Sequence, residues 1–152
     1  MNLNELIPEE RIASSVTSGS KKRVLESLSH LIVTSEGSLA ETEVFESFLH
    51  RERVGSTAMG PGVAIPHGRM KSLDHAVGAL IRLHGGVDYD ALDGEPVDLV
   101  FGLLVPEDAG EEYLQILSSL AQTLRDTEVC KRIRAARDSK EIYQILLNEF
   151  AN

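Results

Sequence analysis

The chain has 152 residues, 42% of them hydrophobic and 26% charged, which suits one globular domain with a single substantial core. Its formal net charge of −9 and aromatic content of 5%, with no tryptophan, argue against a nucleic-acid partner, because the charge repels phosphates and few aromatic side chains are present to stack on bases. The chain has one cysteine, Cys130, so no disulfide can form within it. The sequence contains no apolar run that resembles a signal peptide or is long enough to cross a membrane, so we expect a cytoplasmic protein with no membrane span.

Two amphipathic helices are expected in the first third of the chain. Ser20 has the residue type of an N-cap, and the first helix ends at Glu36-Gly37-Ser38. Its inner stripe is Val24, Leu25, Leu28, Leu31 and Ile32. The second helix ends near Arg53, and its inner stripe is Val44, Phe45, Phe48 and Leu49.

A loop and three strands are expected next. Residues 55–62 contain three glycines and a proline and form the loop. Val63-Ala64-Ile65 is a short strand that Pro66 ends. Residues 77–83 and 97–105 are the other two strands, and the last of them is so apolar that both its faces should be buried.

The last third is predicted to be helical. The first helix has an inner stripe of Tyr113, Leu117, Leu120 and Leu124. A shorter helical segment after Asp126-Thr127 carries Val129 and Ile133. A final helix begins at Asp138 or Ser139 and buries Ile142, Ile145 and Leu146. This order of elements predicts an α/β or α+β domain in which helices pack on a central sheet.

Groups suited to phosphoryl chemistry gather between Arg51 and Gly68. His67 lies between a proline and a glycine just after the short strand, which exposes an imidazole that is mostly neutral at pH 7 and therefore nucleophilic. The hydroxyls of Ser56 and Thr57, the loop amides and the Arg51 guanidinium are donors of the kind that a phosphoryl group binds. Taken singly, each feature also has an ordinary structural explanation.

A resemblance adds to this constellation. The segment R-E-R-V-G-S-T-A-M-G-P-G-V-A-I-P-H-G resembles the signature of the IIA domains of the fructose/mannitol class of the bacterial phosphotransferase system, and within it the nitrogen-related branch. Supporting segments are residues 20–23, residues 94–100 with Leu104-Val105-Pro106, and residues 129–136. The likeness runs from about Val16 to the end of the chain.

The resemblance implies one type 2 IIA domain over residues 1–152, with a mixed sheet flanked by helices. It implies that His67 is phosphorylated on Nε2 and that Arg51, Ser56 and Thr57 lie in the phosphoryl pocket. The expected donor is a histidine phosphocarrier protein, itself charged by an enzyme I from phosphoenolpyruvate. The expected output is regulation of proteins such as potassium transporters or sensor kinases, and no cofactor is expected.

One position departs from the resemblance. Many relatives carry a second histidine near the phosphorylated one, and Tyr113 stands at that position here. A tyrosine keeps a hydrogen-bond donor but cannot become cationic. Tyr113 is equally the first member of the core stripe of its helix, and the sequence leaves both interpretations open.

Two further groups need an explanation. Lys21-Lys22-Arg23 stand in the first turn of a helix and oppose its dipole, so we expect them to meet an acidic partner or a nearby carboxylate. His30, His50, His75 and His84 lack the spacing of metal ligands, so no zinc site is expected.

Two other functions stay open beside the phosphoryl carrier. One is a pure regulatory binding module in which His67 is only a contact. The other is the IIA component of a fructose/mannitol-type sugar permease, which would need a membrane component.

Overall fold

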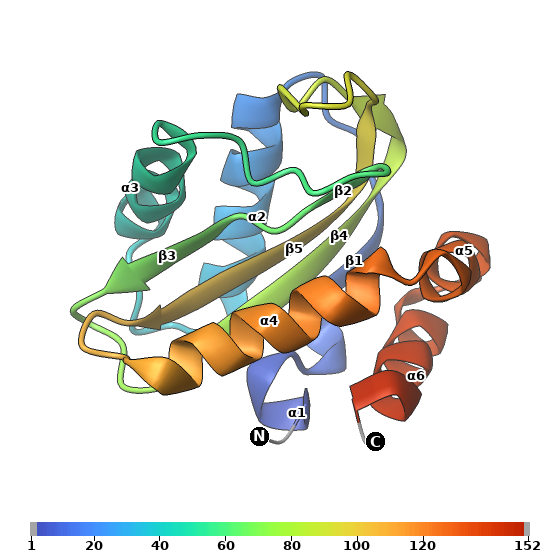
Figure 1. The fold of residues 1–152 in the computed structure, drawn as a ribbon. Helices are drawn as coiled ribbons and strands as arrows, with labels where there is room; N and C mark the ends of the chain where they lie inside the picture. Colours follow the sequence, from blue (N-terminus) through green and yellow to red (C-terminus); the bar gives the residue numbers. More distant parts are fainter. Residues whose placement is uncertain (1–2, 151–152) are drawn as a thin grey trace.

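A five-stranded mixed sheet lies between two layers of helices in the computed structural model, which describes residues 3–150 (Figure 1). The elements are α1 (Leu3–Leu6), η1 (Glu9–Arg11), β1 (Ile12–Val16), α2 (Lys21–Ser35), α3 (Glu41–Glu52), β2 (Val63–Ala64), β3 (His67–Met70), β4 (Val77–Val87), β5 (Val97–Pro106), α4 (Glu111–Arg125), α5 (Thr127–Ala135) and α6 (Ser139–Phe150). The expected fold class, helices on a central mixed sheet, is confirmed.

The two shortest strands form one interrupted edge of the sheet. The strand order is β1-β4-β5-β2, and β3 also pairs with β5. The strands β2 and β3 are both parallel to β5 in one register, with Val63 opposite Leu99 and His67 opposite Leu103. Ile65-Pro66 separates them, because a proline offers no amide hydrogen to the ladder and is tolerated only at an edge.

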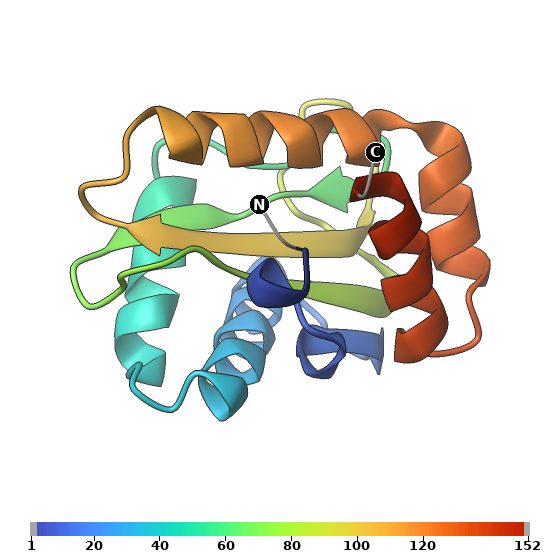
Figure 2. The same ribbon diagram turned by 90° about the horizontal axis from the view of Figure 1, so that it is seen from below.

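Each face of the sheet has its own core. Figure 2 shows α4 on one side of the sheet and α2 with α3 on the other, while α5 and α6 lie toward one end. Val24, Leu28 and Phe48 belong to the core under α2 and α3, and Leu120 and Leu146 to the core under α4 and α6. Most of β5 is buried, as its apolar sequence predicts.

The observed helices match the elements predicted from the sequence better than the observed strands do. The hydroxyl of Ser20 accepts a hydrogen bond from the Arg23 amide at 3.2 Å and caps α2, and Asp126 caps α5. The strand expected over residues 77–83 continues to Val87. The sequence prediction omitted α1, η1, β1 and β3.

His67 is therefore the first residue of a strand rather than a loop residue after one. The omission of β3 has a local reason, since Pro66 is a strand breaker and only the pairing with β5 reveals that the strand resumes.

The contact between α3 and β3 places the end of α3 beside His67. A Cβ added to Gly68 would lie 3.1 Å from the Ser47 carbonyl oxygen, so only a glycine lets the helix approach this closely. The Ser47 hydroxyl donates to the Arg69 carbonyl at 3.2 Å. Arg51 follows Ser47 by one helical turn, and it reaches the same end of the sheet as His67.

Candidate functional site

The half-buried imidazole of His67 is held by the backbone two residues before it. Its Nδ1 donates a hydrogen bond to the Ile65 carbonyl oxygen at 2.7 Å. In a neutral ring this leaves the lone pair on Nε2. Burial lowers the pKa of His67, and the Arg51 charge lowers it further against the opposing effect of the Ile65 bond. The ring is therefore neutral and nucleophilic at pH 7.

His67 lines an open groove of about 870 Å³ between α3, β3 and the start of α4. The groove also contains Arg51 and Tyr113, so the structure brings together three of the five residues singled out in the sequence. Its charged lining consists of Arg51, Arg53, Arg69 and Lys71 against Glu43, Glu46 and Glu107. A surface with a positive balance in a chain of net charge −9 favours an anionic ligand.

The Arg51 guanidinium is tied to the loop that follows its helix. Its Nη1 donates to the Gly55 carbonyl oxygen at 2.9 Å. This bond uses one of the five N–H donors of the guanidinium, and the remaining donors can bind an anion in the groove.

Tyr113 is both a core residue of its helix and a neighbour of His67, the two interpretations that the sequence left open. It is only 8% exposed and belongs to the core under α4. Its ring also lies beside His67, with the centroids 6.2 Å apart and the planes at 48°. Burial raises the pKa of Tyr113, so its hydroxyl stays protonated and can donate a hydrogen bond.

Arg69 is a groove residue that the sequence prediction missed. Its guanidinium lies 4.6 Å from the centroid of the Tyr113 ring and donates to the carbonyl oxygens of Glu107, at 3.1 Å, and Ala109. Residues i and i+2 of a strand share a face, so His67 and Arg69 point to the same side of β3. That signal was in the sequence, but it becomes visible only once residues 67–70 are known to be a strand.

The structure does not bring Ser56 and Thr57 into this groove. The Ser56 hydroxyl donates to the Tyr89 carbonyl oxygen at 2.8 Å. The Thr57 hydroxyl donates to the Glu52 carboxylate, and the Thr57 amide donates to the same carboxylate at 3.1 Å. Both residues fasten the loop after α3, and their direct contact with a phosphoryl group stays a prediction.

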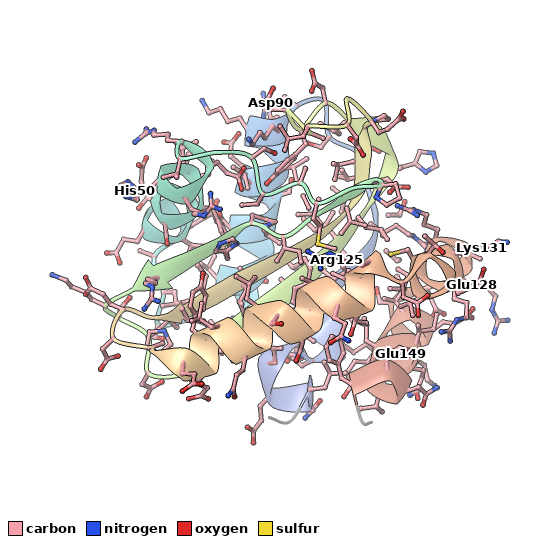
Figure 3. All side chains as sticks on the ribbon, viewed as in Figure 1. His50, Asp90, Arg125, Glu128, Lys131 and Glu149 are labelled. Carbon is pink, nitrogen blue, oxygen red and sulfur yellow. The ribbon has the colours of Figure 1, made fainter. Side chains whose placement is uncertain are left out.

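The residue that follows Arg51, Glu52 at the end of α3, carries a buried carboxylate. The Glu52 carboxylate forms a salt bridge with the Lys21 ammonium at 2.9 Å and accepts a hydrogen bond from the Tyr89 hydroxyl at 3.3 Å. The Lys21 ammonium is also 3.7 Å from Asp90, which Figure 3 places near the start of α2. The carboxylate expected near the cations of α2 is therefore confirmed for Lys21, while Lys22 and Arg23 stay exposed.

Among residues 3–150 no cluster of three histidine, cysteine, aspartate or glutamate side chains could hold a metal ion. No helix in the same range is long and apolar enough to cross a bilayer.

Comparisons with known proteins define the class to which this fold and site belong. Residues 5–149 match the family model of the phosphoenolpyruvate-dependent sugar phosphotransferase system, EIIA 2. The chain belongs to this family of phosphotransfer components.

Within the family, the chain resembles the nitrogen regulatory proteins. It is 42% identical over 146 residues to one from Bradyrhizobium diazoefficiens, an alignment that covers 96% of this chain and 95% of that protein. The crystal structure of the nitrogen regulatory protein IIA-Ntr from Neisseria meningitidis superposes with a TM-score of 0.89 at 41% identity, covering 95% of this chain and 98% of that one. The mannitol IIA of Escherichia coli shares the fold, with a TM-score of 0.74 at 21% identity over 90% of this chain and 96% of that one.

Proposed function

We propose that the chain is a phosphoryl carrier of a nitrogen-related phosphotransferase system, and that Nε2 of His67 accepts the phosphoryl group from a histidine phosphocarrier protein. The observation that carries the proposal is the hydrogen bond from Nδ1 to the Ile65 carbonyl, made by a ring that lines the same groove as Arg51 and Arg69. This bond leaves the lone pair on the other nitrogen and fixes the ring plane.

The transfer exchanges one nitrogen–phosphorus bond for another. The Nε2 lone pair of His67 attacks phosphorus, and the bond from phosphorus to the donor's imidazole nitrogen breaks. The donor's ring keeps that electron pair, and the proton of His67 stays on Nδ1, hydrogen-bonded to the Ile65 carbonyl oxygen. No water is consumed, and reversal returns the phosphoryl group to the donor.

Three groups of the groove supply positive charge and donors to the transferred group. Arg51 and Arg69 bring guanidinium groups to the groove that His67 lines, and Tyr113 offers a protonated hydroxyl. Phosphoryl transfer depends mainly on such positioning and charge stabilisation, since the protein does little covalent chemistry beyond the nucleophile itself. Ser56 and Thr57 contribute by holding the loop that binds the Arg51 side chain.

The proposed output is regulation rather than sugar uptake. The supporting observation is that the relatives near 42% identity bear the name nitrogen regulatory protein. A phosphoryl group adds roughly two negative charges to one patch, enough to change docking with a partner. The proposed targets are proteins such as potassium transporters or sensor kinases.

The test is a phosphorylation assay with phosphoenolpyruvate, enzyme I and the cognate phosphocarrier. We expect one acid-labile, alkali-stable phosphoryl group on the wild-type chain, none on His67→Ala, and one on the matched variants His50→Ala and His84→Ala. An unlabelled wild-type chain would favour the pure binding module. A label that survives in His67→Ala would move the site to another residue.

A further inference from the structure

A chain of hydrogen bonds links the buried carboxylate of Glu52 to the imidazole of His67. The Glu52 carboxylate accepts from both the amide and the hydroxyl of Thr57. The Thr57 carbonyl accepts from the Ile65 amide at 3.0 Å. The Ile65 carbonyl then accepts from Nδ1 of His67 at 2.7 Å. Three successive links therefore separate a buried charge from the nucleophile.

The geometry of the edge strand explains why Ile65 is available for both bonds. Along a strand, alternate residues turn their backbone N–H and C=O toward one neighbour or the other. The Pro66 carbonyl accepts from the Leu103 amide and so faces β5. Ile65 faces outward, where an edge strand leaves its backbone groups unpaired. Thr57 and the His67 ring occupy those two outward groups.

The Glu52 carboxylate, at which this series of hydrogen bonds begins, is a buried charge with several partners. The Glu52 side chain is 2% exposed, and it receives Lys21 and Tyr89 in addition to the two groups of Thr57. The Lys21 ammonium also lies 4.7 Å from the centroid of the Tyr89 ring. Burying an ion pair costs desolvation energy, so the pair by itself is weak evidence for a stabilising role.

We propose that Glu52, paired with Lys21, is a positioning residue that holds His67 in its Nδ1–H tautomer through Thr57 and Ile65. This inference rests on the proposed function of His67. Glu52 is the last residue of α3 and follows Arg51 in the sequence. The role explains why a lysine stands in the first turn of α2 despite the helix dipole.

Two variants alter the ion pair at which this series of hydrogen bonds begins. Glu52→Gln removes the charge at nearly constant volume, and Lys21→Met removes its cation. Their matched controls are Glu128→Gln, an exposed glutamate of α5 in Figure 3, and Lys22→Met, the exposed lysine next in sequence. If Lys21→Met fails to fold, Thr57→Val removes the hydroxyl link while keeping the amide link.

The first readout is the tautomer of His67 by nitrogen NMR of the ring, which needs no phosphoryl donor. We expect the Nδ1–H form to predominate in the wild-type chain and in both controls, and to give way to a mixture in the folded Glu52→Gln and Lys21→Met variants. An unchanged tautomer in folded variants would overturn the inference, whatever the chain's activity.

The second readout is the rate of phosphoryl transfer to His67. We expect the turnover rate of the two variants to fall about tenfold or more with little change in the KM for the donor, because misplacing a nucleophile affects the transition state rather than docking. Equal rates in variants and controls would contradict the inference. If the wild-type chain shows the expected tautomer but no phosphoryl transfer, the proposed function is refuted. The positioning role of Glu52 is not contradicted by that result.

Discussion

At the scale of single residues, the central question is the protonation of His67. Burial, then the Arg51 charge, lower its pKa from the ordinary value of 6.5, and the Ile65 bond raises it by less than these lower it. We predict that the ring titrates below 6.5 in the folded chain, as measured by NMR, and that Arg51→Met raises the midpoint. A midpoint above 6.5 would show that the ring is not buried against a cation.

The same shift affects stability. Between the folded pKa and 6.5 the unfolded chain binds more protons than the folded one, so the free energy of unfolding falls as the pH drops through that window. We predict that His67→Gln removes this part of the pH dependence, leaving a flatter curve in urea titrations at pH values between 7 and the folded pKa. Parallel curves for the two proteins would contradict the assigned shift.

Tyr113 can be tested without disturbing its packing. Tyr113→Phe keeps the ring under Arg69 and in the core but removes the hydroxyl. We predict a free energy of unfolding within about 1 kcal/mol of the wild type, since no buried partner is lost, and a shorter lifetime of phosphorylated His67. If the lifetime is unchanged, the tyrosine serves the core alone.

At the scale of elements, the packing of α3 on β3 decides whether Arg51 reaches His67. A Cβ at residue 68 would crowd the Ser47 carbonyl oxygen at 3.1 Å and the carbonyl carbon at 3.2 Å. We predict that Gly68→Ala lowers the free energy of unfolding by about 1–3 kcal/mol, the usual cost of overpacking, and slows phosphorylation. The control is Gly37→Ala, where a Cβ meets nothing within 4 Å. Equal stability of the two variants would mean that α3 can shift freely.

Sequence periodicity predicted the helices well because each buries one stripe of its own residues. It predicted β1 and β3 poorly because these strands exist through their pairing. The segment Ile12–Val16 contains two serines, and its place in the sheet comes from β4. The segment His67–Met70 follows a proline, and its place comes from β5.

The same reason limited the prediction of the site. His67 and Arg51 belong to one continuous motif and were found from the sequence. Arg69 depends on the face of an unpredicted strand. The partners of Thr57 depend on Glu52, whose neighbours Lys21 and Tyr89 are far from it in the chain.

At the scale of the whole molecule, charge is distributed unevenly. The chain is acidic overall, yet the rim of the groove carries the exposed cations Arg53 and Lys71. We predict that Arg53→Glu slows association with the phosphorylated donor and weakens its dependence on ionic strength, because rim charges act mainly on the association rate. The reversal Lys131→Glu on α5, away from the groove in Figure 3, is the control. Equal association rates for the two reversals would place docking elsewhere.

The most direct test of the account is nitrogen and phosphorus NMR of the phosphorylated chain with labelled histidine rings. We predict a single phosphoryl group bonded to Nε2 of His67, with the proton still on Nδ1 and its bond to Ile65 intact. A phosphoryl group on Nδ1, or on any other residue, would contradict the central claim.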